Sequence, residues 1–259
     1  MNILILSLLA LVETTAPMSA PIVAPPNPVA VERPRVAIID SGIARTAELG
    51  SLVSAEYDMA SDTGRPEFQP RYDHGTMVAT ILARAANRQV DIISLRIDDP
   101  AGCPEGANPP CQPSAAPVAR AIRRATELGV DAINISLALD KDPTITAAIA
   151  DAAAKGIRVV LAAGNNGYDH PGNLGPARAA YPNAVLVGAV DAQGQPWSGT
   201  NRPDAKPDGY NYAWALGVKV PTAAIDGRPV TGTGTSFAAP LETARFLTSR
   251  TMAGVMAGK

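Results

Sequence analysis

The sequence predicts an α/β fold in a single domain, with a mostly parallel central sheet and helices on both of its faces. Short apolar runs alternate along the chain with segments of helical periodicity about 10–15 residues long, an alternation typical of right-handed crossovers between parallel strands. Apolar residues make up 46% of the 259 residues, enough for a sizeable core. Only 4% of the residues are aromatic, so small and aliphatic side chains must fill that core.

The elements can be assigned in chain order from the apolar runs and from helix-capping signals. A predicted helix that begins after Asp142 has Pro143 in its first turn and Gly156 at its end, which are favoured capping positions. In a sheet of this kind, functional groups gather at the carboxyl ends of the strands. The predicted strands are 36–39, 92–97, 132–137, 159–163 and 185–190, and the predicted helices are 74–86, 118–128 and 143–155.

The amino-terminal residues predict export. Residues 3–12 form an uncharged apolar run, too short for a membrane-spanning helix, which needs about 20 residues. The run fits the hydrophobic region of a secretory signal peptide. A buried strand, or a start codon placed wrongly, remains an alternative. We expect a signal peptide over residues 1–20 and a periplasmic or secreted protein.

A proline-rich tether is predicted to follow. Six prolines lie between Thr14 and Pro34, and such a density excludes a regular helix and favours an extended chain. The tether is assigned to residues 21–34 and the folded domain to residues 35–259. Because only this segment precedes Val36, no folded propeptide is expected.

Charge and cysteine content exclude several classes of function. The formal net charge is −2, which argues against nucleic acid, or a membrane surface, as a partner held by bulk charge. No histidine lies near the two cysteines in the sequence, so a Cys/His zinc cluster is not expected. Cys103 and Cys111 lie in a Pro- and Gly-rich stretch, residues 98–113, and in an exported protein they would form a local disulfide. In a cytosolic protein they would be free thiols.

Three polar residues stand at a predicted strand end or helix start. Asp40 ends the first strand, and His74 begins the first predicted helix. Ser236 follows a Gly-Thr-Gly-Thr stretch and opens a helix whose free N–H groups can stabilise negative charge. Taken singly, these residues could be a helix cap, a structural histidine and a simple turn. The loop before Ser236 lacks the lysine of a phosphate-binding loop, so nucleotide binding is not expected.

The three motifs together identify a function far more specifically than any one of them does alone. An Asp, a His and a Ser in this chain order are one of the known arrangements of catalytic residues in nucleophilic hydrolases. With these motifs the chain resembles the subtilisin-like serine proteases, or subtilases, over residues 33–246. The resemblance implies that Ser236 is the nucleophile, that His74 is its base and that Asp40 orients the base. It also implies that Asn165, rather than serving as a turn residue, provides an oxyanion donor together with the Ser236 N–H.

The substrate-binding strand departs from the family pattern. Subtilases commonly have Ser-Leu-Gly-Gly here, whereas this chain has Ser136, Leu137, Ala138 and Leu139. The resemblance implies that Ser136, Leu137, Ala138 and Gly164 bind substrate. Because glycines leave room for a substrate, Ala138 and Leu139 should narrow the pockets, and we expect a preference for small residues just before the scissile bond.

No cofactor is expected, and no metal site is assigned. Many subtilases bind calcium through loops rich in Asp and Asn. Residues 58–65 and 201–211 contain such side chains and are the candidates for calcium, but neither loop has EF-hand spacing. Asp98 and Asp99, on the proline-rich loop, are expected to be solvated. His170 is expected to be a surface-loop residue rather than a ligand or a second base.

These observations predict an exported, monomeric serine endopeptidase that cleaves polypeptides through an acyl-enzyme intermediate. A narrow-specificity processing protease is an alternative suggested by the altered binding strand. A non-catalytic peptide-binding module on the same scaffold is another. The presence of Asp40, His74, Asn165 and Ser236 together argues against the module, because a scaffold without catalysis has no physical need for all four.

Overall fold

The protein is described by a computed structural model that covers residues 33–107, 109–139 and 141–257. The predicted signal peptide and residues 21–32 of the predicted tether lie outside the described residues. Within the described ranges, no helix is both long enough and apolar enough to cross a membrane.

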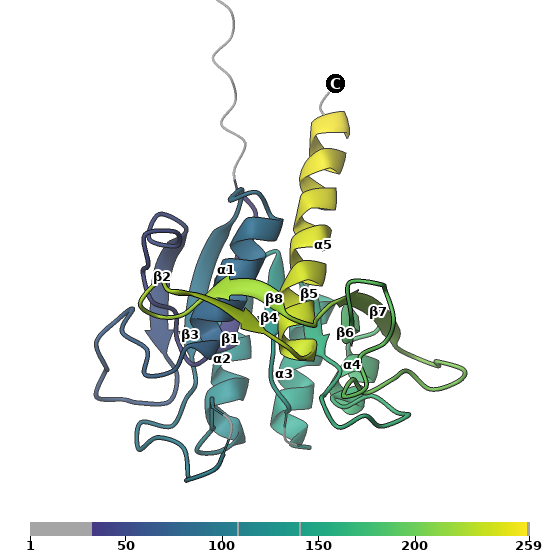
Figure 1. Cartoon of the computed structure of the whole chain (residues 1–259), viewed down its shortest axis with the longest axis horizontal. Coiled ribbons are helices and arrows are strands. Elements are labelled where there is room, and N and C mark those ends of the chain that lie inside the picture. Colours follow the sequence, from purple (N-terminus) through teal and green to yellow (C-terminus); the bar gives the residue numbers. More distant parts are fainter. Residues whose placement is uncertain (1–32, 108, 140, 258–259) are drawn as a thin grey trace, which may run out of the picture. The chain divides into compact units, whose positions relative to one another are not determined.

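A seven-stranded sheet forms the centre of the described chain (Figure 1), in the order β2-β3-β1-β4-β5-β6-β7. Each neighbouring pair of strands runs parallel, which confirms the predicted fold class. The inner strands are buried along almost their whole length, as parallel strands covered on both faces must be. The strands are β1 Arg35–Asp40, β2 Val53–Asp58, β3 Asp91–Arg96, β4 Ala132–Ile135, β5 Arg158–Ala162, β6 Ala184–Val190 and β7 Asn211–Leu216.

Helices cover both faces of the sheet, and alternate residues of β1 enter the two resulting cores. Val36 and Ile38 belong to a core that includes side chains of α1 and α5, whereas Ala37 and Ile39 belong to a core that includes side chains of α2, α3 and α4. Helices α1 and α5 pack against each other, as Figure 1 shows. The helices are α1 His74–Ala85, α2 Ala115–Glu127, α3 Pro143–Ala154, α4 Leu174–Ala179 and α5 Thr235–Ala257.

The predicted elements are confirmed, with one shortened strand and several additions. The strand predicted over 132–137 leaves the ladder after Ile135, so Ser136 and Leu137 are free of the sheet. The edge strands β2 and β7, and the short helix α4, had no long apolar run to mark them. An antiparallel hairpin of β8 Val220–Ala223 and β9 Pro229–Gly232 precedes α5.

The order of the strands reverses beside β1. From β1 the chain moves outward to β2 and returns through β3, whereas β4 to β7 extend on the other side of β1. In open parallel sheets, ligands bind outside the carboxyl ends of the strands at such a reversal. Asp40 ends β1 and Ser136 follows β4, so both lie at this point.

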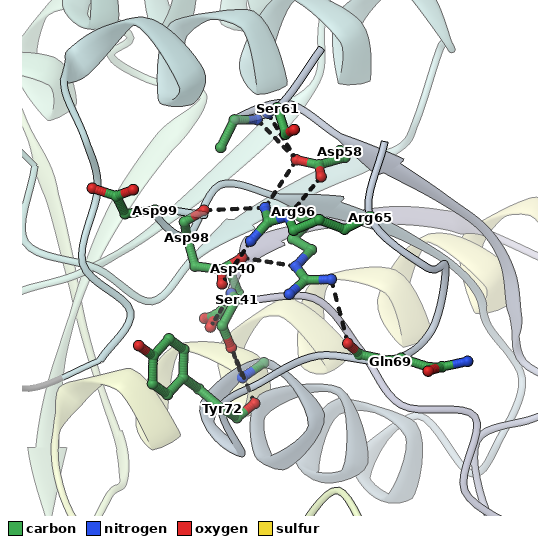
Figure 2. Close-up of polar contacts among 12 residues, drawn as sticks. Asp40, Ser41, Asp58, Ser61, Arg65, Gln69, Tyr72, Arg96, Asp98 and Asp99 are labelled. Carbon is green, nitrogen blue, oxygen red and sulfur yellow. Dashed lines mark hydrogen bonds and ion pairs between the residues drawn. The ribbon is translucent and has the colours of Figure 1, made fainter. Parts of the chain in front are cut away.

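A buried ion cluster lies next to the end of β1 (Figure 2). The Arg96 guanidinium donates to Asp98 Oδ1 at 2.8 Å, and Arg65 donates to Asp98 Oδ2 at 2.9 Å and to Asp58 Oδ2 at 2.7 Å. The side chains of Arg96 and Asp98 are 5% and 1% exposed. The expectation that Asp98 is solvated is therefore wrong, because a guanidinium buried at the end of β3 needs a buried counter-ion.

Replacement of Asp98 by alanine is expected to lower the free energy of unfolding by about 3–5 kcal/mol, because it leaves two guanidinium groups without their shared buried partner. Urea denaturation measures this change. Asp99→Ala is the matched control, since the Asp99 side chain is more exposed and accepts the Ala101 N–H rather than a guanidinium. Equal decreases in the free energy of unfolding in the two variants would contradict a stabilising role for the cluster.

Candidate active site

The end of β1 and the start of α1 bring Asp40 and His74 together. His74 Nδ1 lies 2.9 Å from each oxygen of Asp40, whose side chain is almost fully buried. The Ser41 N–H donates to Asp40 Oδ1 at 2.7 Å. The close approach depends on Gly75, because a Cβ at this residue would overlap the carbonyl oxygen of Gly42 and lie 3.2 Å from Asp40 Cβ. The carboxylate is thereby held as an acceptor facing the imidazole.

This environment sets the charge and the tautomer of His74. Burial lowers the pKa of the imidazole, but the charge of Asp40 and its hydrogen bond outweigh burial, so the pKa lies above its ordinary value. Because the Asp40 carboxylate is an acceptor, Nδ1 carries the proton and Nε2 of the neutral ring is left as the acceptor. The ring of Phe237 packs beside the imidazole, with the ring centroids 5.5 Å apart.

The Ser236 hydroxyl lies in the first turn of α5 and points to the binding strand. Its Oγ donates to the carbonyl oxygen of Ser136 at 2.8 Å, and the Ser136 hydroxyl donates back to the carbonyl oxygen of Ser236 at 2.8 Å. Pro240 explains the second bond, because it lacks the N–H that would otherwise bond to Ser236 O within the helix. In the part of the chain that the structure describes, no hydrogen bond joins Ser236 Oγ to His74.

Buried side chains fix this pair of serines from behind. Asn134 Nδ2 donates to Ser136 Oγ at 2.9 Å, and Thr243 Oγ1 donates to Asn134 Oδ1 at 2.9 Å. Asn134 and Thr243 are fully buried. This chain of bonds ties β4 to α5, so the segment after β4 and the first turn of α5 keep a fixed separation.

Asn165 is oriented by the residue that precedes Ser236. Its Oδ1 accepts from both the N–H and the hydroxyl of Thr235 at 2.9 Å, which leaves Nδ2 as the amide group that can donate to a ligand. The Gly164 N–H donates to Thr235 Oγ1 at 3.1 Å. Asn201 supports the same turn, since its Oδ1 accepts from the N–H groups of Asn166 and Tyr168.

His74, Asn165 and Ser236 meet on the wall of one cavity of about 510 Å³. Of the four residues expected to bind substrate, Ser136, Leu137 and Ala138 also line this cavity, whereas Gly164 is outside its wall and donates its N–H to Thr235. Asp40 lies behind His74.

A disulfide-closed loop forms another part of the cavity wall. Cys103 and Cys111 are joined by a disulfide, as predicted for an exported protein. Pro109, Pro110, Cys111 and Gln112 line the cavity. The Cys103 N–H donates to the Tyr72 hydroxyl at 2.9 Å, which ties this loop to the segment just before His74.

A second cavity of about 1010 Å³ adjoins the first at Ala138. Ala138 and Leu139 both line this second cavity, which has room for a large side chain. The narrowing of the substrate pockets expected from these two residues stays a prediction that substrate profiling tests. His170 lies at its rim, exposed and stacked on Tyr168, as expected of a surface-loop residue. The apolar lining includes Ala138, Leu139, Pro143, Ala147, Ala150, Pro171, Leu174, Pro176 and Ala179.

In the two loops considered for calcium, the side-chain oxygens of Asp58 and Asn201 are already engaged. The oxygens of Asp58 accept from Arg65 and from the N–H groups of Ala60 and Ser61, and Asn201 Oδ1 accepts from two N–H groups. Throughout residues 33–107, 109–139 and 141–257, no three His, Cys, Asp or Glu side chains are grouped so that they could hold a metal ion.

Several residues that build this site carry no signal of their own in the sequence. Thr235 is a neighbour of Ser236, and its position directly before a candidate nucleophile could have marked it. Asn134, Asn201 and Thr243 act over long sequence separations, and nothing local distinguishes them from other polar residues.

The chain matches known proteins along most of its length. A sequence model of the Subtilase family matches residues 32–244. Mycosin-4 of Mycobacterium tuberculosis is 33% identical over 199 residues, 62% of this chain and 42% of that protein. Alkaline elastase YaB of Bacillus sp. is 31% identical over 167 residues, 61% of this chain and 39% of the elastase. The chain thus spans about two fifths of the length of these relatives.

Solved structures share the fold. A mutant of the protease domain of PatA superposes with a TM-score of 0.68 at 22% identity, covering 89% of this chain and 84% of that domain. The prenylagaramide maturation protease PagA superposes with a TM-score of 0.66 at 21% identity, covering 88% of this chain and 78% of PagA.

Proposed function

The chain belongs to the subtilase family, and from that membership we propose that it is a serine endopeptidase that cleaves polypeptides through an acyl-enzyme intermediate. The observation that carries this proposal is the convergence of His74, Asn165 and Ser236 on one cavity, with Asp40 bonded to His74 from behind. A nucleophile, its base and an oxyanion donor are the groups that acyl transfer needs.

In the acylation step, Ser236 Oγ attacks the carbonyl carbon of the scissile bond while His74 Nε2 takes the hydroxyl proton. The negative charge moves to the carbonyl oxygen, where the Asn165 amide and the Ser236 N–H donate to it. Collapse breaks the C–N bond, and His74 passes its proton to the leaving amine. The buried carboxylate of Asp40 stabilises the imidazolium formed between these transfers.

Deacylation repeats these steps with water as the nucleophile in place of the Ser236 hydroxyl. Water attacks the ester carbon of the acyl-enzyme, His74 takes one of its protons, and the Ser236 hydroxyl is regenerated as the ester bond breaks. The products are two shorter peptides, one with a new carboxylate and one with a new amino group.

Export is part of the proposal. The Cys103–Cys111 disulfide supports a periplasmic or extracellular location, because disulfides persist in oxidising compartments. Residues 1–20 would act as a signal peptide, residues 21–34 as a tether, and the enzyme would work as a monomer.

Cleavage of an unfolded polypeptide tests the proposal against its alternatives. Reduced and alkylated casein is incubated with the wild type or with Ser236→Ala, and new amino termini are counted by mass spectrometry. Cleavage at many sites by the wild type alone is expected. Cleavage at very few sites would favour the narrow processing protease. Binding without cleavage by the folded wild type would favour the peptide-binding module.

The second cavity predicts a preference for a large apolar residue just before the scissile bond. A peptide library should show Leu, Met or Phe there. Ala150→Phe places a ring in the cavity and is expected to lower kcat/KM for such substrates about tenfold. For a substrate with alanine just before the scissile bond, kcat/KM should stay unchanged.

The matched control for this prediction is Ala154→Phe, at the exposed end of the same helix and away from the cavity lining. It should leave both substrates unaffected. A library profile dominated by glycine and alanine would contradict the assignment of this cavity.

A further inference from the structure

We propose that the carbonyl oxygen of Ser136 restrains the Ser236 hydroxyl in the free enzyme and releases it to substrates that carry an N–H on the residue before the scissile bond. This selectivity rests on the proposed endopeptidase function. It makes peptides better substrates than small acyl compounds that lack such an N–H.

The resting position of the hydroxyl is the first step. Ser236 Oγ donates to Ser136 O at 2.8 Å, so its proton points away from His74 Nε2, the atom that must remove it. Rotation of the short Ser236 side chain would turn the proton from Ser136 O toward His74. A neutral hydrogen bond of this kind favours the restrained rotamer by about 2- to 13-fold.

The Ser136 carbonyl is held in place by the bonds around it. The side-chain hydroxyl of the same residue, Ser136, donates to Ser236 O and accepts from Asn134 Nδ2. Because Pro240 leaves Ser236 O without a helical partner, this bond has no competitor within α5. The restraint is therefore built into the join between β4 and α5.

The same carbonyl faces the place where a peptide would pair. After Ile135 the chain is no longer bonded into the sheet, and Leu137 O and Leu139 N turn to the side chain of Asn173. On the other side of this segment, Ser136 and Ala138 line the cavity that also holds Ser236. An extended peptide can add to such an edge as a further strand.

Pairing and release then become one event. A peptide N–H that donates to Ser136 O approaches from the cavity side, where the Ser236 hydroxyl now lies. The hydroxyl loses its partner and rotates to His74 Nε2 as the scissile carbonyl arrives. A substrate without that N–H leaves the hydroxyl restrained for most of its residence in the cavity.

The resting state can be tested by NMR titration of the histidines, independently of turnover. The chain has two histidines, and His170→Gln assigns the signals of His74. Asp40 is the charged group that contacts the ring and is unchanged in these variants. If the Ser236 hydroxyl is bonded to the Ser136 carbonyl oxygen, Ser236→Ala is expected to shift the pKa of His74 by less than about 0.2.

A hydroxyl bonded to Nε2 would instead stabilise the neutral ring, so its removal would raise the pKa of His74 by about 0.4 or more. That result would overturn the proposal.

Substrate analogues test the release. A peptide with an ester oxygen in place of the N–H of the residue before the scissile bond is expected to lose about 2- to 13-fold in kcat, the range set by the restraining hydrogen bond. The matched control carries the ester one residue earlier, where the N–H of an extended peptide points away from Ser136. A rise in KM with unchanged kcat would overturn the proposal, because it would mean that the N–H contributes only to substrate binding and not to release of the Ser236 hydroxyl. Absence of cleavage of the unmodified peptide would instead count against the endopeptidase function.

Discussion

Asp40→Asn is expected to lower kcat/KM by about 10⁴-fold while the fold is retained, a magnitude taken from the same change in another serine protease. The carboxylate accepts from His74 Nδ1, whereas an amide would present its NH₂ group and favour the tautomer with the proton on Nε2. That tautomer cannot take the proton of Ser236. Steady-state kinetics with a peptide substrate measure the loss, and thermal unfolding confirms that the variant folds.

The pH dependence provides a second readout of this prediction. His74 acts as a base only when neutral, so kcat/KM should fall as the pH drops through its pKa, which lies above the ordinary 6.5. Burial lowers the pKa of His74 and Asp40 raises it, so Asp40→Asn should move the acidic limb to lower pH while the plateau falls.

Asp73→Asn is the matched control, because this neighbouring carboxylate accepts from the Ile225 N–H rather than from His74. Its kcat/KM should change by less than about threefold. An acidic limb that stays in place in Asp40→Asn would contradict the assigned role of Asp40.

Asn165→Ala is expected to lower kcat by about 10²–10³-fold with little change in KM, the effect measured for the oxyanion donor of subtilisin itself. The structure supports the role because Thr235 engages Oδ1 and leaves Nδ2 free to donate. Binding of the ground state does not need this donor, so the loss should fall on kcat. Rates of acylation measured in single turnovers would locate the effect.

Two further variants sharpen the test of Asn165. Thr235→Val removes the hydroxyl bond but keeps the N–H bond, and should give a smaller loss of about tenfold. Asn166→Ala is the control, because Asn166 uses its backbone N–H rather than its side chain to bond Asn201. A loss in Asn166→Ala equal to that in Asn165→Ala would mean that the turn, rather than a donor, is what matters.

Local sequence signals predicted the elements that carry the site. The apolar run before Asp40, the helix start at His74 and the glycine-rich approach to Ser236 each depend on near neighbours in the chain, and the structure reproduces β1, α1 and α5. Strands β2 and β7 were missed because edge strands bury only part of their length and lack a continuous apolar run.

Contacts between distant residues could not be predicted in the same way. Asp98 lies just after a strand and at the start of a loop that contains Pro100, which suggests a solvated side chain, and only the approach of Arg65 and Arg96 makes it a buried counter-ion. The width of the second cavity depends on how α3 and α4 pack beside Ala138, and the identities of Ala138 and Leu139 alone cannot specify that packing.

The most direct test of the central claim is covalent capture of Ser236. A peptidyl diphenyl phosphonate is incubated with the wild type and with His74→Ala, and the adduct is mapped by mass spectrometry. The phosphorus would bond to Ser236 Oγ as phenol leaves, and one adduct on Ser236 in the wild type, strongly slowed in the variant, is the predicted result. A well-folded wild type that gains no adduct, or gains it on another residue, would contradict the assignment of Ser236 as an activated nucleophile.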